Sequence, residues 1–144
     1  MTKDLTIRPA TLDDRPALRD LFLLARRETF VWQRAHSFQP DDFDTLTEGE
    51  DVLLAQRADT QITGFVSVWM PDRFIHHLFV APSSQRQGVG LALLRALPQW
   101  RARRYRLKCL TRNEAALAFY RAQGFTPIDA GVSEDGAYLL LESR

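Results

Sequence analysis

Residues 78–91 read LFVAPSSQRQGVGL. The run Phe74–Val80 is almost continuously apolar, which predicts a strand that is covered on both faces. A turn follows this strand, and a leucine-rich helix over Leu91–Leu97 follows the turn. Two glycines let the backbone approach a ligand closely, and the free N–H groups at the helix start point outward. Together with Arg86, these donors predict a site for a phosphate or a diphosphate.

The same turn lacks the features of other nucleotide motifs. It has neither the Gly-Lys-Ser/Thr of a P-loop nor the three spaced glycines of a dinucleotide fold. A nucleotide-hydrolysing protein is therefore disfavoured, because the lysine and the magnesium-binding hydroxyl are absent. Taken alone, the two glycines are equally well explained by a tight turn between a strand and a helix.

The rest of the chain alternates between strand and helix signals. One helix carries an apolar stripe, and a second begins at the N-cap Asn113 and ends at Gly124. From Glu28 to Asp51 the period fades, and we expect an irregular or short-helical segment. Strands are predicted at Leu5–Arg8, Val52–Gln56, Ile62–Met70, Leu107–Leu110, Thr126–Ile128 and Ala137–Leu141. Without a repeat or a linker, we expect one α/β domain over residues 1–144.

The composition is that of an ordinary folded domain of 144 residues, with 45% hydrophobic and 26% charged side chains. Nineteen basic and eighteen acidic residues give a net charge of +1, so a nucleic-acid partner is not expected. No apolar run approaches the roughly 20 residues of a membrane helix, and no signal core is present, so we expect neither a membrane nor export. A single cysteine, Cys109, excludes an internal disulfide. A single thiol suits a reducing compartment, so we expect a cytoplasmic protein. His36, His76 and His77 do not have the spacing of zinc ligands, so we expect no metal.

A second motif lies downstream of the glycine turn. The pattern Asn-x-x-Ala-x-x-Phe-Tyr-x-x-x-Gly-Phe is met by Asn113, Ala116, Phe119, Tyr120, Gly124 and Phe125. In this order and spacing, the turn and the second motif together resemble the GNAT superfamily of N-acetyltransferases. The resemblance spans almost the whole chain. It implies an α/β fold with a splayed, mixed central sheet flanked by helices, and acetyl-coenzyme A bound where two central strands part.

The resemblance also assigns roles to particular residues. A stretch of strand would pair its backbone with the pantetheine arm, the amides of the turn would hold the diphosphate, and Asn113 would contact the pantetheine arm as well as cap its helix. The cofactor-binding residues implied in this way are Leu78, Phe79, Val80, Arg86, Gln87, Gly88, Val89, Gly90, Leu91 and Asn113.

Tyr120 is the expected general acid. The resemblance implies that its hydroxyl points at the sulfur of acetyl-coenzyme A. The spacing in the sequence agrees with a shared site, because seven residues bring Asn113 and Tyr120 to one helix face two turns apart. A phenol near its ordinary pKa of ~10 stays protonated at neutral pH and can protonate a leaving thiolate. The alternative is a core aromatic residue whose hydroxyl is hydrogen-bonded.

His76 is the expected general base. It stands where arylalkylamine acetyltransferases, which this strand resembles, carry a catalytic histidine, and an imidazole titrating near ~6.5 suits proton removal through a water. In a regular strand His77 points to the opposite face, so only one of the two rings should reach the acetyl group. For both histidines the alternative is a hydrogen-bonded core residue.

Lys108 departs from the pattern of one branch of the family. Protein N-terminal acetyltransferases commonly carry a glutamate five residues before the helix asparagine, and a cation cannot act as the same base. Lys108 is either a substrate-facing cation or a snorkelling surface lysine. Cys109 is expected to be a small buried hydrophobe rather than an acetyl acceptor.

The segment before residue 52 offers candidates for the acceptor side. Its acidic residues Asp41, Asp42, Asp44, Glu48, Glu50 and Asp51 either attract a cationic amine or form a solvated loop, and the loop is the simpler interpretation. The aromatic residues Phe30, Trp32 and Phe38 either line an apolar wall or belong to the core.

The expected activity is transfer of an acetyl group from acetyl-coenzyme A to a primary amine of a small molecule by direct attack. Acetylation of a protein or peptide amine is one alternative. A non-catalytic acyl-coenzyme A sensor is another. A homodimer seam along the strands from Thr126 to Leu141 is compatible with the sequence, as is an edge strand that is simply charged or covered.

Overall fold

The computed structural model describes residues 5–29 and 42–144. Its strands are β1 (Leu5–Pro9), β2 (Asp51–Arg57), β3 (Ile62–Trp69), β4 (Phe74–Val80), β5 (Arg106–Leu110), β6 (Thr126–Ser133) and β7 (Gly136–Glu142). Its α-helices are α1 (Arg15–Thr29), α2 (Asp42–Leu46), α3 (Val89–Arg95) and α4 (Glu114–Ala122). Three single turns of 3₁₀ helix, η1 (Leu12–Asp14), η3 (Met70–Asp72) and η4 (Pro82–Ser84), connect some of these elements.

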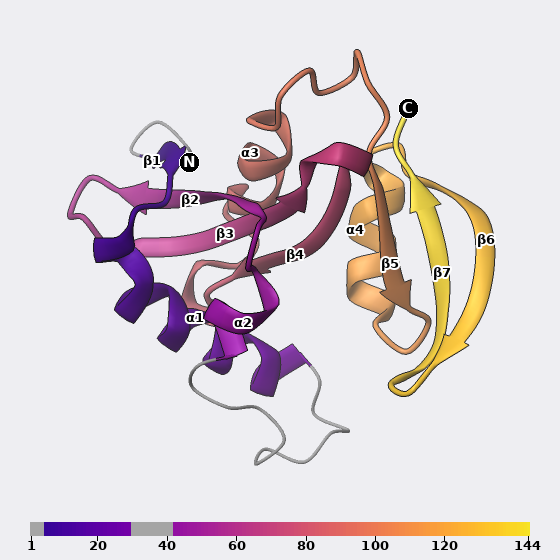
Figure 1. Cartoon of the computed structure of the whole chain (residues 1–144), viewed down its shortest axis with the longest axis horizontal. Coiled ribbons are helices and arrows are strands. Elements are labelled where there is room, and N and C mark those ends of the chain that lie inside the picture. The colour runs from indigo at the N-terminus through magenta and orange to yellow at the C-terminus, as the bar shows by residue number, and fades with distance from the viewer. Residues whose placement is uncertain (1–4, 30–41) are drawn as a thin grey trace.

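The seven described strands form one mixed sheet in the order β1-β2-β3-β4-β5-β7-β6. All neighbouring pairs are antiparallel except β4 and β5, which are parallel. The β4–β5 pairing covers only Phe74↔Arg106 and Ile75↔Leu107. Beyond these residues the two strands diverge, and Figure 1 shows α4 behind the region where they part. The mixed, splayed sheet expected from the sequence is confirmed.

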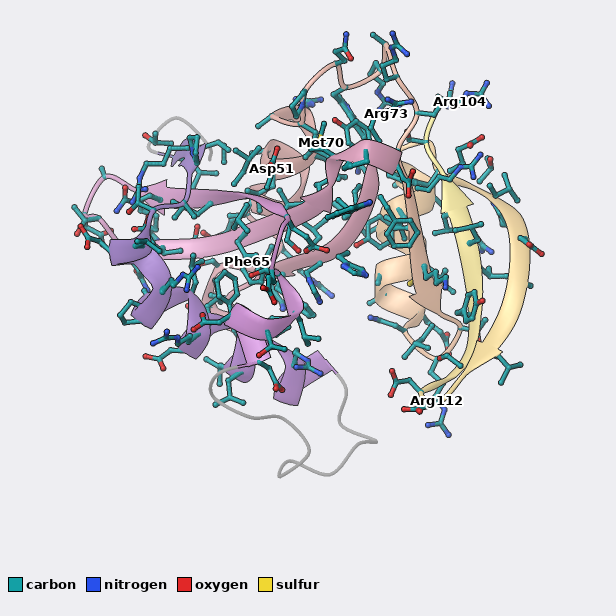
Figure 2. All side chains as sticks on the ribbon, viewed as in Figure 1. Asp51, Phe65, Met70, Arg73, Arg104 and Arg112 are labelled. Carbon is teal, nitrogen blue, oxygen red and sulfur yellow. The ribbon has the colours of Figure 1, made fainter. Side chains whose placement is uncertain are left out.

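Each face of the sheet carries its own hydrophobic cluster. On one face, α3 and α4 supply Leu93, Leu94, Leu117 and Tyr120, which pack with Val66, Val68, Ile75 and Leu107 of the strands. On the other face, α1 and α2 supply Leu18, Leu21, Phe22 and Phe43, which pack with Leu54 and Phe65. Figure 2 shows Phe65 on the side of α1 and α2. The sheet is covered on both faces, as the apolar run of β4 predicts.

The local signals at the helix ends are confirmed. Asn113 caps α4, since its side-chain oxygen accepts the N–H of Ala116 at 3.3 Å, and Gly124 follows the helix with φ +94°. Thr11 and Asp14 form a capping box before α1, and Arg8 pairs with Asp14 at 2.9 Å. The Arg8 guanidinium holds the pKa of the Asp14 carboxyl well below its usual range.

Most strand boundaries agree with the prediction to within one residue, and the larger differences are in β6 and in α3, which also ends at Arg95 instead of Leu97. Helix α3 begins at Val89 instead of Leu91, because Gly88 already serves as its N-cap. Strand β6 runs on to Ser133, whereas the sequence predicts a strand that ends at Ile128. Its residues are mostly exposed at the edge of the sheet, so no apolar alternation marks their strand character, and their pairing with β7 alone defines it.

A bulge in β4 changes the expected orientation of the two histidines. The β3–β4 register passes from Ser67↔His77 to Val68↔Ile75, so His76 is an extra residue without a partner in β3. Alternation is broken there, and the rings of His76 and His77 lie 5.3 Å apart, centroid to centroid. The expectation that they point to opposite faces is therefore wrong, because it assumed a regular strand.

Among the described helices, none is both long and apolar enough to cross a membrane. Several residues considered for the acceptor side, Phe30, Trp32, His36, Phe38 and Asp41, lie outside the described part of the chain.

Candidate active site

The edge of β4 that faces β5 offers backbone groups beyond the point where the two strands part. The N–H of Ala81 donates to Thr63 of β3 at 2.8 Å, and Gly64↔Val80 is the next pair in register. Because bonding alternates along an antiparallel pair, Phe79 directs its backbone to β3, while Leu78 and Val80 direct theirs away from it. Strand β4 pairs with β5 only as far as Ile75. An extended ligand can therefore take the place of a neighbouring strand beside Leu78 and Val80.

The turn after β4 has the backbone shape of an anion site. Arg86 has φ +64° and Gly88 has φ +81°, and both are exposed. Left-handed residues within a turn direct successive N–H groups to one side, which forms a concave nest of donors. The first helical bond of α3 runs from the Ala92 N–H to the Gly88 carbonyl, so the preceding amides of the helix have no partner within it.

Gly90 joins the two sequence motifs in space. A Cβ at Gly90 would lie 3.2 Å from the Phe119 ring, so the absence of a side chain lets α3 pack closely on α4. Phe119 and Tyr120 are themselves in contact, with ring centroids 5.3 Å apart. The glycine turn and the Phe-Tyr helix, some thirty residues apart in sequence, therefore form one packed unit.

Tyr120 projects from α4 and is 9% exposed. Its ring packs edge-on against Phe125, and no hydrogen bond to its hydroxyl is found among the described residues. Burial, with a smaller effect of Cys109, raises the pKa of Tyr120 above its ordinary value. The phenol is therefore more firmly protonated than the near-unperturbed group expected from the sequence, because the sequence does not give its burial.

Asn113 and Cys109 also lie around the end of the splay. The amide oxygen of Asn113 is used for capping, and its two N–H donors have no partner in the described part of the chain. Burial raises the pKa of the Cys109 thiol to about 11, and the residue is 6% exposed. A thiol that is not ionised at neutral pH is a poor nucleophile, which supports its interpretation as a small hydrophobe.

Lys108 is an exposed residue of β5. Its ammonium lies 4.9 Å from the centre of the Tyr138 ring on the neighbouring strand β7. This cation–π contact favours the interpretation of Lys108 as a surface lysine whose stem covers apolar surface.

The two histidines share a carboxylate. Nδ1 of His76 is hydrogen-bonded to Oε2 of Glu50, and Nδ1 of His77 lies 4.0 Å from Oε1 of the same residue. Ser67 bonds His77 through its hydroxyl at 2.8 Å, and burial lowers the pKa of His77 to about 3, with smaller effects of His76 and Arg26. His77 is therefore neutral, while the side chain of His76 is 52% exposed to solvent.

Glu50 is the member of this cluster that sequence reasoning missed. The sequence groups it with the solvated acidic loop, whereas its side chain is only 3% exposed. No spacing rule connects it to His76, 26 residues away. The donor atoms of Glu50, His76 and His77 lie within 4.8 Å of one another, a spacing that would also suit a metal ion. Since a hydrogen bond already joins Glu50 and His76, we describe the group as a hydrogen-bonded cluster.

The expected acid and base belong to opposite faces of the sheet. His77 packs on Phe22 of α1 with ring centroids 5.0 Å apart, so the histidine cluster lies on the face of α1 and α2. Tyr120 belongs to the cluster under α3 and α4. A group bound along the diverging edge of β4 would thus have an imidazole towards one face and a phenol towards the other. This arrangement suits a transfer in which one proton is removed and another is supplied.

Comparison with known proteins identifies the class of this protein. A family model described as an acetyltransferase (GNAT) domain matches residues 48–127. The chain is also 32% identical to the peptidyl-lysine N-acetyltransferase YiaC of Escherichia coli (strain K12) over 137 residues, which cover 90% of this chain and 88% of that protein. The chain therefore belongs to the GNAT family of acetyltransferases, enzymes whose acetyl donor is acetyl-coenzyme A.

Solved structures agree on the fold. The PaiA N-acetyltransferase of Thermoplasma acidophilum, solved in complex with coenzyme A, has a TM-score of 0.78 at 16% identity and covers 97% of this chain and 98% of its own. The ribosomal-protein-S18-alanine N-acetyltransferase of Escherichia coli has a TM-score of 0.73 at 21% identity, over 96% of this chain and 92% of its own. The GNAT fold expected from the two motifs is confirmed.

Proposed function

We propose that residues 1–144 form one N-acetyltransferase domain that moves the acetyl group of acetyl-coenzyme A directly to an alkyl primary amine. The observation that carries this proposal is the splay of β4 and β5, which has the hydrogen-bonded His76 towards one face and the phenol of Tyr120 towards the other. Membership of an acetyltransferase family argues against the sensor that sequence analysis left open.

The residues around the splay fit the donor. In this proposal Leu78 and Val80 pair with the pantetheine arm, since their backbone groups face away from β3 and Phe79 lies between them. Asn113 donates from its amide nitrogen to the same arm, while its amide oxygen caps α4. The diphosphate is held by the amides from Arg86 to Leu91, including those of Gln87, Gly88, Val89 and Gly90, and the exposed Arg86 guanidinium adds a positive charge.

The chemistry requires two proton transfers. Acetyl-coenzyme A supplies a thioester whose carbonyl carbon accepts the amine nitrogen, so that a C–N bond forms and the C–S bond breaks. Nε2 of His76 takes the proton that the nitrogen loses, directly or through one water. The Tyr120 hydroxyl gives a proton to the sulfur, and a backbone N–H of β4 stabilises the negative charge on the carbonyl oxygen.

Two sources of the amine follow from different observations. The sequence predicts a small molecule. The relationship to a peptidyl-lysine N-acetyltransferase favours the lysine side chain of a protein, and the 52% exposure of the His76 side chain is compatible with an acceptor that approaches from solvent. We take lysine as the first candidate, and the small amine as the second.

A thiol-release assay with matched acceptors tests this proposal. One arm uses small amines, including polyamines, and the other uses folded proteins, followed by mass spectrometry of their lysines. Turnover only in the protein arm supports lysine, and turnover only in the small-amine arm supports the second candidate. Binding of acetyl-coenzyme A in calorimetry without turnover in either arm would refute transfer to an amine.

The role of His76 is tested by His76→Ala. Loss of a general base typically lowers kcat by about 10²-fold or more, and the affinity for acetyl-coenzyme A should not change. Unchanged kcat and an unchanged pH–rate profile would mean that another base, or bulk water, takes the proton.

A further inference from the structure

Glu50 holds a carboxylate in a place where an unpaired charge is costly. The residue directly precedes β2 in the chain, and its side chain is 3% exposed. Oε2 is hydrogen-bonded to Nδ1 of His76, but Oε1 has no hydrogen-bond partner among the described residues. Burying a carboxylate requires compensation by hydrogen bonds or by an opposite charge. Within the described part of the chain, one oxygen of this carboxylate therefore has no hydrogen bond, and a neighbouring group must compensate the charge.

His77 cannot provide that charge. Its Nδ1 is 4.0 Å from Oε1, and its pKa, lowered by burial to about 3, keeps the ring neutral near pH 7. The same Nδ1 is already bonded to the Ser67 hydroxyl at 2.8 Å. His76 is different, because it contacts the carboxylate with Nδ1 while half of its side chain is open to solvent.

The fold brings Glu50 to His76 through the sheet register. Asp51 pairs with Val68 across β2 and β3, and Val68 pairs with Ile75 across β3 and β4. Because β2 and β4 run in the same direction, Glu50 lies one residue to one side of this row and His76 one residue to the other side, so the register brings the two residues near each other but does not place them opposite one another. In a regular strand His76 would point to the face opposite His77. The bulge at His76 breaks this alternation and turns the His76 ring to the side of the carboxylate.

We propose that Glu50 is a positioning residue for the general base. Its carboxylate accepts the Nδ1–H of His76 and holds the tautomer in which the lone pair of Nε2 is free to take the proton of the amine. Once that proton has moved, the carboxylate faces an imidazolium and stabilises it, which is the role of the carboxylate behind the histidine in a catalytic triad. This inference rests on the proposed function, in which His76 is the base.

A double-mutant cycle separates this role from a structural one. The variants are Glu50→Gln, His76→Ala and the two together, with Glu48→Gln as the matched control, because Glu48 is exposed and two residues away. We expect Glu50→Gln to lower kcat on the order of tenfold or more, with KM for acetyl-coenzyme A unchanged. Added to His76→Ala, it should have no further effect, since Glu50 acts only through His76.

The outcomes distinguish the possible failures. If His76→Ala leaves kcat unchanged, the proposed base is wrong. If His76→Ala slows the enzyme but Glu50→Gln does not, or if the two effects multiply, then the positioning role of Glu50 is wrong. Loss of activity on treatment with EDTA, restored by Zn²⁺, would also overturn it, because the cluster would then act through a metal. A melting temperature equal to that of the wild type excludes a folding defect as the cause of a lower kcat.

The wild-type protein provides a test that needs no substitution. The ¹⁵N chemical shifts of a neutral histidine identify which ring nitrogen carries the proton. We expect the proton of neutral His76 on Nδ1 and a lone pair on Nε2. A proton found on Nε2 would overturn the proposal, because that nitrogen could not act as a base.

Discussion

Replacing Tyr120 by phenylalanine removes one oxygen and separates catalysis from stability. The phenol has no hydrogen bond among the described residues, so Tyr120→Phe breaks no hydrogen bond within that part of the fold. The Tyr120 hydroxyl oxygen is not one of the fully buried polar atoms without a hydrogen bond, so the melting temperature should change little. If the hydroxyl protonates the leaving sulfur, kcat should fall by about 10²-fold, equivalent to about 2.7 kcal/mol of activation free energy.

Tyr105→Phe is the matched control. The Tyr105 hydroxyl donates to the Pro98 carbonyl at 2.5 Å, and the residue is fully buried in the same cluster as Tyr120. Its loss should cost about 1–3 kcal/mol, which lowers the melting temperature by about 3–9 °C in a domain of this size. The activity per folded molecule should not change. Steady-state kinetics and thermal unfolding of both variants provide the comparison.

The reasoning about Tyr120 is refuted by two results. One is a Tyr120→Phe enzyme whose kcat equals that of the wild type. The other is a fall in melting temperature as large as that of Tyr105→Phe, which would mean that the hydroxyl has a structural hydrogen bond.

Three further predictions follow from the structure. Asn113→Ala should lower stability by about 1 kcal/mol and raise KM for acetyl-coenzyme A, whereas Asn113→Asp should keep the helix cap and lose only cofactor affinity; equal KM values for all three proteins would contradict the cofactor contact. Gly90→Ala should lower the melting temperature by a few degrees, because its Cβ would lie 3.2 Å from Phe119, and the smaller Phe119→Leu should reduce that loss in the double variant. Urea unfolding should reveal decreasing stability below pH 6.5, by up to about 2 kcal/mol at pH 5, because the pKa of His77 is about 3 in the folded state and the unfolded chain binds the extra proton; His77→Gln should remove this part of the pH dependence.

Much of the fold could be predicted because its signals are local. The apolar run of β4, the glycine turn after it and the cap of α4 each depend on residues within one turn or one strand. The two motifs also predicted the family. Two predictions failed because the sequence carries no local signal for the feature. Strand β6 has no apolar alternation, and no residue around His76 distinguishes a regular strand from a bulged one.

The amino-acid sequence by itself determined the class of this protein, the glycine turn after β4 and the helix that carries Asn113 and Tyr120, because each depends on residues close together in the chain. Tertiary structure alone decided that Glu50 is buried behind His76, that burial keeps His77 neutral and that the Tyr120 hydroxyl has no hydrogen bond to residues 5–29 or 42–144. The physical reason is that burial and charge compensation depend on which strands become neighbours, and the pairing of β2, β3 and β4 brings together residues that are 26 positions apart.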